Sequence, residues 1–166
     1  DWQRLLFAVN QKAMSCNSID FQLLQTLPLL LRNYNWSMQV VVRETEIIAL
    51  QALHSPILGL AIDLGTTNIA ILLVDLSTGN TLSSKGADNP LGKYGADVIS
   101  RLSHAKNKPE TLLQMQQLLI AVINDSATEL CGENGLNKSS IVDIVVAGNT
   151  VMQHLFLALS VDHLGL

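Results

Sequence analysis

Two short apolar segments separated by a six-residue turn constrain this chain most. Residues 57–62 and 69–74 are rich in Ile, Leu and Val, and residues 63–68 between them read Asp-Leu-Gly-Thr-Thr-Asn. Apolar runs of this length around turn residues predict two buried β-strands joined as a hairpin. A second turn at 75–80 leads into a less apolar segment at 81–85, which we expect to be an edge strand. Three antiparallel strands are therefore predicted to open a domain.

Helices and one further strand are predicted to complete this domain. The expected elements are, in order, a helix at 96–104, a helix from Pro109 to Gly132 or Gly135, a buried strand at 141–146, and a helix at 151–159. Pro suits the first helical position and Gly the position after a helix ends. The alternation of strands and helices indicates an α/β domain.

The first third of the chain has a different pattern. Residues 1–36 repeat their apolar positions at helical spacing and predict two helices, with Ser18 and Asp20 as candidate N-caps between them. Two short β-branched segments, 38–42 and 46–50, follow and predict a pair of strands. We therefore expect a small ααββ domain at 1–54, a boundary near Pro56, and the larger α/β domain at 57–166.

Composition excludes several classes of function. The chain has 166 residues, of which 48% are hydrophobic and 14% charged, and its net charge is −4. It contains no Lys/Arg cluster, so we expect no nucleic-acid partner. The most apolar stretch, 141–161, is interrupted by polar residues, so we expect no membrane partner.

The cysteines and the start of the chain bear on its setting. Cys16 and Cys131 are far apart and form no CxxC pair, which argues against a zinc or iron–sulfur site here and favours a reduced, cytoplasmic setting. The chain begins at Asp1 with no pattern of a signal peptide, and we expect the start to be an arbitrary cut.

The turn at 63–68 carries the first chemical signal. Gly65 lets the backbone approach a ligand closely, and successive backbone N–H groups with the hydroxyls of Thr66 and Thr67 can donate to a phosphate. Asp63 would repel that anion directly, so its natural role is to hold Mg²⁺, either directly or through a coordinated water. The alternative is an ordinary hairpin whose residues merely suit a turn.

A second polar turn lies at the end of the last predicted strand. Gly148, Asn149 and Thr150 follow the apolar run and precede a helix, at a position where open sheets place ligands and where a helix N-terminus favours anions. The alternative is a strand-to-helix connection in which Asn149 or Thr150 only caps the helix.

Three motifs in this order resemble the ATP-dependent reductive activators of corrinoid proteins (RACo-like proteins) of the actin/Hsp70/sugar-kinase (ASKHA) superfamily. The segments that carry the resemblance are Gly-Leu-Ala-Ile-Asp-Leu-Gly-Thr-Thr at 59–67, Asn-Pro at 89–90 with Tyr-Gly-Ala-Asp-Val-Ile-Ser-Arg at 94–101, and Gly-Asn-Thr at 148–150 with Met152 and His154. Residues 1–42 also resemble the small middle or linker-type domain that precedes the nucleotide-binding domain in these proteins. Asn68 and Val151 stand where Thr is expected, and Gln153 where His is common.

The resemblance implies a fold, cofactors and partners. The fold would be the first lobe of a ribonuclease H-like ASKHA ATPase domain after a small domain. The complete protein would use ATP and Mg²⁺ to drive reduction of Co(II) corrinoid to Co(I), with electrons from an iron–sulfur domain outside this chain. Its partners would be a corrinoid protein and an electron donor, and a homodimer is one option. The chain itself would be a fragment without ATPase activity of its own.

The resemblance also implies roles for named residues. Asp63 would be the catalytic and Mg²⁺-binding residue. The nucleotide-binding residues would be Gly65, Thr66, Thr67, Asn68, Gly148, Asn149 and Thr150. Two other classes remain open on the residues alone: another ASKHA enzyme, either a dehydratase activator or a small-molecule kinase, and a noncatalytic protein-binding module.

Overall fold

The computed structural model describes residues 1–12 and 15–164. The chain divides into two units, Asp1–Ile57 and Leu58–Leu166, and each is described by itself. Gly165 and Leu166, which close the predicted second domain, lie outside the described residues.

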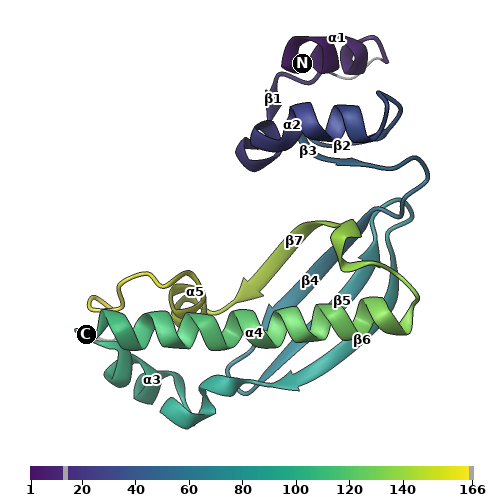
Figure 1. Cartoon of the computed structure of the whole chain (residues 1–166). Helices are drawn as coiled ribbons and strands as arrows, with labels where there is room; N and C mark the ends of the chain where they lie inside the picture. Colours follow the sequence, from purple (N-terminus) through teal and green to yellow (C-terminus); the bar gives the residue numbers. More distant parts are fainter. Residues whose placement is uncertain (13–14, 165–166) are drawn as a thin grey trace. The chain divides into compact units, whose positions relative to one another are not determined.

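The N-terminal unit contains two helices and a three-stranded sheet (Figure 1). Its elements are α1 (Trp2–Asn10), β1 (Ser18–Ile19), α2 (Phe21–Asn33), β2 (Gln39–Arg43) and β3 (Glu46–Gln51). The two helices and the β2–β3 pair were predicted, and both predictions are confirmed. The two-residue strand β1 was not predicted, and it adds a parallel partner to β3, giving the order β1-β3-β2.

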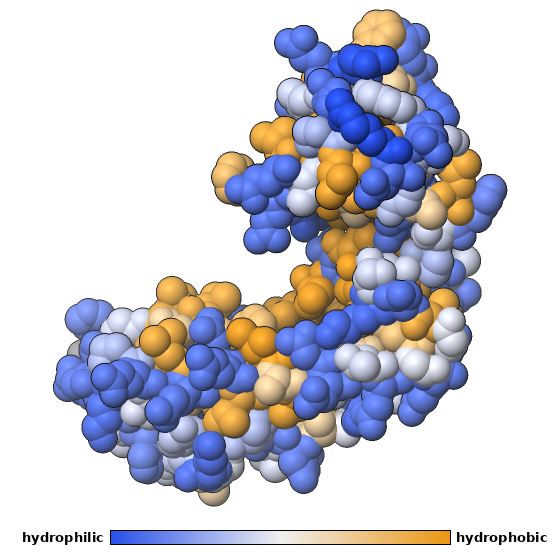
Figure 2. Space-filling view, in the orientation of Figure 1, coloured by the Kyte–Doolittle hydropathy of each residue, from blue (hydrophilic) through white to orange (hydrophobic). Residues whose placement is uncertain are grey.

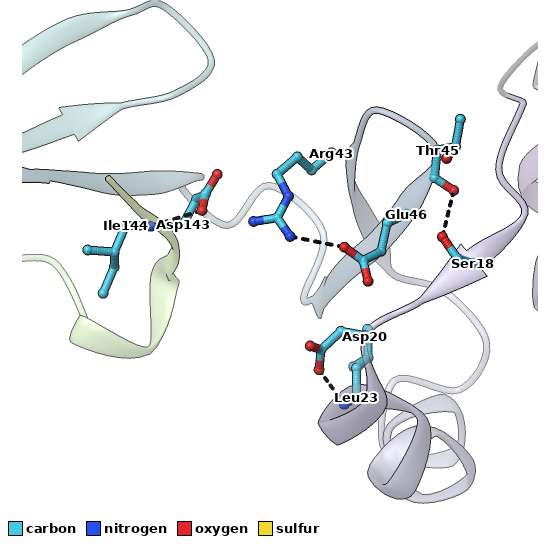
Figure 3. A network of polar contacts seen from close by, with 8 residues as sticks. All are labelled: Ser18, Asp20, Leu23, Arg43, Thr45, Glu46, Asp143 and Ile144. Carbon is cyan, nitrogen blue, oxygen red and sulfur yellow. Dashed lines mark hydrogen bonds and ion pairs between the residues drawn. The ribbon is translucent and has the colours of Figure 1, made fainter. Parts of the chain in front are cut away.

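Local polar contacts set the ends of these elements (Figure 3). The Asp20 carboxylate accepts a hydrogen bond from the backbone N–H of Leu23 at 2.9 Å, which caps α2 as predicted. The alternative cap, Ser18, is wrong, because Ser18 lies in β1 and its hydroxyl donates to the carbonyl of Thr45. Arg43 and Glu46 form an ion pair of 3.0 Å across the β2–β3 turn (Figure 3).

The second unit is a four-stranded mixed sheet with helices (Figure 1). Its elements are β4 (Leu58–Leu64), β5 (Asn68–Asp75), β6 (Asn80–Asp88), the 3₁₀ helix η1 (Pro90–Tyr94), α3 (Val98–Ala105), α4 (Pro109–Glu133), the 3₁₀ helix η2 (Lys138–Ser140), β7 (Ile141–Gly148) and α5 (Thr150–Leu157). The strand order is β6-β5-β4-β7. The three antiparallel strands β4, β5 and β6 are confirmed, and β7 joins the same sheet parallel to β4.

The long helix α4 covers one face of this sheet (Figure 1). Met115 and Leu119 on α4 are fully buried in the same cluster as Ile62, Leu64 and Ile71 of the strands. Alternate residues of each strand point to the same face, so the other residues of β4 and β5 lie on the opposite face. That opposite face carries Asp63.

The turn between β4 and β5 is shorter than predicted. Strand β4 runs through Leu64 and β5 begins at Asn68, so only Gly65, Thr66 and Thr67 lie outside the strands. Asp63 was predicted to lie in the turn, but it is a strand residue. Cross-strand pairing accounts for the difference, because Asp63 is opposite Ala70 on one side and Ala147 on the other.

Strand β7 was predicted to be buried, and this is wrong for part of its length. In the described residues β7 is an edge strand, and its side chains Ile144 and Val145 are 51% and 65% exposed. Figure 2 shows apolar surface in the region of β7 and α5. An apolar run alone does not distinguish a central strand from an edge strand, since either can carry it.

The bounds of α3 and α5 differ from the prediction, and the end of α4 agrees with one of its two predicted alternatives, Gly135. Helix α3 begins at Val98 instead of residue 96, because the Asp97 carboxylate accepts from the backbone N–H of Ser100 at 2.8 Å and caps it. Gly132 lies inside α4, and Gly135, with φ of +65°, follows the end of that helix. Helix α5 spans Thr150–Leu157 and not 151–159. Within the described residues, none of the helices combines the length and the apolarity needed to cross a membrane.

Candidate functional site

The predicted site residues gather at one end of the sheet, where the parallel strands β4 and β7 both finish. Leu64 pairs with Gly148 in register, so the turn after β4 and the turn after β7 lie next to each other. A Cβ atom on Gly148 would lie 3.1 Å from the Leu64 carbonyl oxygen, so the two strand ends pack tightly. The carboxyl ends of parallel strands are the usual place for a ligand in an open α/β sheet.

We call Gly65, Thr66 and Thr67 the phosphate loop. A Cβ atom on Gly65 would lie only 2.4 Å from the carbonyl oxygen of Asn68, so this tight turn requires glycine. The backbone N–H groups of Thr66 and Thr67 donate to no acceptor among the described residues. Two successive unpaired donors of this kind can bind an anion.

Asn149 connects the second turn to the phosphate loop. Its Nδ2 donates to the Thr66 hydroxyl oxygen at 3.2 Å, and its Oδ1 accepts from the backbone N–H of Met152 at 3.0 Å. Asn149 is therefore the N-cap of α5 and also a contact of the loop, so the two alternative interpretations of this residue are compatible. Because Thr66 accepts through its oxygen, its own hydroxyl hydrogen remains available to a ligand.

Asp63 lies in a row of very small residues. Its cross-strand neighbours are Ala70 on β5 and Ala147 on β7, and Ala70 in turn pairs with Gly86 on β6. All four residues are exposed. The carboxylate therefore has open space on both sides, on the face opposite α4.

The remaining predicted residues lie at the rim of this group. Asn68 is the first residue of β5 and is exposed, and Thr150 is the first residue of α5. The Gly148 carbonyl accepts from Nε2 of Gln153 at 2.8 Å. The structure thus brings all eight predicted residues to one end of the sheet.

Asn89 and Gln153 were not predicted as site residues, although the side-chain amide of each donates to a carbonyl of one of the two turns. Asn89 Nδ2 donates to the Gly65 carbonyl at 2.7 Å. Their position in the sequence was the available signal, because Asn89 belongs to the Asn-Pro motif at 89–90 and Gln153 lies between Met152 and His154. Their partners could not be read from the sequence, because Asn89 and Gly65 are 24 residues apart.

A buried arginine braces the same region. Arg101 is 1% exposed, and its Nε donates to the Gly95 carbonyl at 3.0 Å while Nη1 lies 3.5 Å from the Met152 sulfur. Burial lowers the pKa of the Arg101 guanidinium, and the nearby Asp97 carboxylate opposes that shift. Arg101 thus links the segment after η1 to α5.

Other features of the structure do not coincide with this site. A cavity of about 530 Å³ in the N-terminal unit is lined by residues that include Arg4, Lys12 and Trp36, and by none of the predicted site residues. Within residues 1–12 and 15–164, no three His, Cys, Asp or Glu side chains are grouped as metal ligands.

Comparison with known proteins identifies the family. The model of the RACo middle region matches residues 58–166. The chain belongs to the RACo family. The model of the RACo linker region matches residues 1–55 of this RACo chain.

Two individual relatives of this RACo chain extend the comparison. It is 34% identical over 113 residues to the corrinoid activation enzyme RamQ of Eubacterium limosum, which covers 68% of the chain and 19% of RamQ. A solved structure of a reductive activator for corrinoid,iron-sulfur protein matches with a TM-score of 0.81 and 34% identity, over 97% of this chain and 27% of that one. The chain therefore spans about a fifth to a quarter of the length of these relatives. The match to the solved structure confirms the predicted α/β class.

Proposed function

We propose that the complete protein is an ATP-driven reductive activator of a corrinoid protein, and that this chain supplies its linker region and the first lobe of its ASKHA nucleotide-binding domain. The observation that carries the proposal is the phosphate loop, in which two N–H groups without a partner among the described residues lie at the same end of the sheet as the exposed carboxylate of Asp63. The names of the relatives, which describe corrinoid activation and reductive activation, supply the reaction class.

The residues of the site fit a magnesium nucleotide. The loop N–H groups and the Thr66 hydroxyl supply donors without net charge, which suits phosphate oxygens. Asp63 supplies one carboxylate with open space around it, and Mg²⁺ is commonly held by one or two carboxylates together with water and phosphate oxygens. Mg²⁺ at Asp63 would neutralise phosphate charge during cleavage of the terminal phosphate.

In the proposed reaction the residues of this chain bind and orient the nucleotide. They hold the phosphate end of ATP, and the facing lobe and the adenosine pocket belong to the rest of the protein. Hydrolysis of ATP to ADP and phosphate would then drive the transfer of one electron from an iron–sulfur cluster outside this chain to Co(II), which becomes Co(I). The complete protein would be cytoplasmic, and its partners would be a corrinoid protein and an external electron donor. A homodimer is one option for its oligomeric state.

The test is ATP-dependent formation of Co(I). The complete protein is mixed with a Co(II) corrinoid protein and a reductant, and the absorbance spectrum is followed with and without MgATP. We expect Co(I) only when MgATP is present, and loss of that effect in Asp63→Ala. Asp125→Ala, which removes an exposed carboxylate on α4, is the matched control and should behave as the wild type. Co(I) formation that is independent of ATP would contradict the proposal.

A further inference from the structure

We propose that Asn89 is a positioning residue that holds the phosphate loop in its anion-binding conformation, an inference that rests on the proposed nucleotide function. Asn89 contacts both ends of the loop. Its Nδ2 donates to the Gly65 carbonyl at 2.7 Å, and its backbone N–H donates to the Thr67 carbonyl at 2.8 Å. The first and last residues of the loop are therefore fixed to one residue that follows β6.

The contact with the Gly65 carbonyl determines where the backbone donor of Thr66 points. In a trans peptide the carbonyl and the following N–H lie in one plane and point in opposite directions. Because the Gly65 carbonyl is turned toward Asn89, the N–H of Thr66 is turned away from it. Thr66 is also the loop residue whose hydroxyl oxygen accepts from Asn149 at 3.2 Å. The loop is thus held by one asparagine through its carbonyls and by another through a hydroxyl.

The rest of the Asn89 side chain is equally committed. Its Oδ1 accepts from the backbone N–H of Leu91 at 2.9 Å, which caps η1, and the residue is only 6% exposed. A buried amide in which both ends are hydrogen-bonded has one orientation, because rotation would leave a polar group without a partner. The capping contact therefore fixes the direction of the donor to Gly65.

Asn137 provides a comparison within the same chain. Its Oδ1 accepts from the backbone N–H of Ser139 at 2.9 Å and caps η2 in the same manner, but Asn137 is exposed. Capping a 3₁₀ helix therefore requires neither burial nor a contact with another loop. The burial of Asn89 and its two contacts with the phosphate loop are additional features, and the inference depends on them.

The experiment uses the complete protein and three variants. Asn89→Ser keeps an oxygen that can accept from Leu91 but removes the amide donor to Gly65, without adding charge. Asn89→Asp keeps the shape of the side chain and serves as a second variant if the first does not fold. Asn137→Ala removes a cap of the same kind elsewhere and is the matched control. Thermal melts establish that each variant is folded at the temperature of the assay.

Two readouts separate positioning from stability. Calorimetry measures the affinity for MgATP and for adenosine, since a loop that contacts phosphate affects only the first. Hydrogen exchange measures the backbone amide at position 89, which reports on the contact with Thr67 without any nucleotide. We expect Asn89→Ser to weaken MgATP binding roughly tenfold, to change adenosine binding less than about twofold, and to speed exchange at position 89. Asn137→Ala should change none of these.

The outcomes distinguish the inference from the proposed function. If the wild type binds MgATP and folded Asn89→Ser binds it equally well, the positioning role is wrong and the proposed function stands. An equal loss for MgATP and adenosine would show a general structural effect and would also overturn the inference. If the wild type binds no MgATP, the proposed function fails. The role of Asn89 in holding the loop is then decided by exchange at position 89, and an unchanged rate overturns it.

Discussion

Replacing Gly65 with alanine adds only one methyl group, but it should lower both the stability of the protein and its affinity for MgATP. The new Cβ atom would lie 2.4 Å from the carbonyl oxygen of Asn68, whereas Cβ atoms essentially never approach other heavy atoms below 3.0 Å. The loop must therefore move by at least about 0.6 Å. The obstructing atom belongs to the backbone, so a change of side-chain rotamer cannot relieve the contact.

The expected cost follows from that displacement. Introducing a methyl group into a closely packed position costs roughly 1–3 kcal/mol of stability. A shift of about 0.6 Å disturbs the hydrogen bonds from the loop to phosphate, and losing one hydrogen bond to a charged group costs about 1.5–3 kcal/mol, so MgATP binding should weaken by roughly tenfold or more. We therefore expect Gly65→Ala to lose both stability and nucleotide affinity.

Gly132→Ala is the matched control. Gly132 lies inside α4, its φ is not positive, and a Cβ atom there would meet nothing within 4 Å among the described residues. Alanine in a helix interior is favoured over glycine by about 1 kcal/mol, so this variant should be slightly more stable than the wild type. Urea unfolding and calorimetry with MgATP measure both quantities. Unchanged stability and affinity in Gly65→Ala would refute the argument from steric contact.

Three further predictions concern the helices around the site and the chain as a whole. Hydrogen bonds from the Ser100 N–H and hydroxyl lower the pKa of Asp97 below its ordinary 3.8. The ionised carboxylate therefore stabilises the fold above pH 3.8, and this stabilisation is lost as the pH falls through the lower pKa of Asp97 in the folded protein. Asp97→Ala should lower the melting temperature at pH 7 but much less at pH 2. Arg101→Ala should cost about 2–4 kcal/mol in urea unfolding, because it empties a fully buried position, whereas Arg32→Ala, at an exposed ion pair, should cost less than about 1 kcal/mol. The proposed function places the facing lobe in the rest of the protein, so the 166-residue chain alone should release no phosphate from ATP above background and should bind MgATP weakly. Steady turnover with micromolar affinity would contradict this.

Much of the second unit could be predicted from local sequence patterns. The strands β4, β5 and β6 follow from apolar runs between turns, and α4 follows from an apolar stripe that begins after Pro109. These signals are local, and the observed packing agrees with them. The two-residue strand β1 gave no such signal, because its pairing with β3 joins residues 28 positions apart, such as Ser18 and Glu46.

The residues of the site could be predicted from the sequence, but the contacts between them could not. The loop residues and the Asn149 turn could be singled out because their residue types suit phosphate. The placement of Asp63 depended on cross-strand pairing with Ala70 and Ala147, which a linear pattern does not report. The contact of Asn89 with Gly65 is likewise a product of tertiary structure, in which the turn after β6 returns to the turn after β4.

The most direct test of the account is the magnesium dependence of ATP binding by the complete protein and by Asp63→Ala. Asp63 is exposed and its neighbours are small, so the substitution should leave the melting temperature nearly unchanged. We predict that calorimetry shows tighter ATP binding with Mg²⁺ than without it in the wild type, and that Asp63→Ala loses this difference. If Asp63→Ala binds ATP as the wild type does and keeps the full magnesium dependence, Asp63 does not hold the metal and the proposed magnesium nucleotide site is wrong.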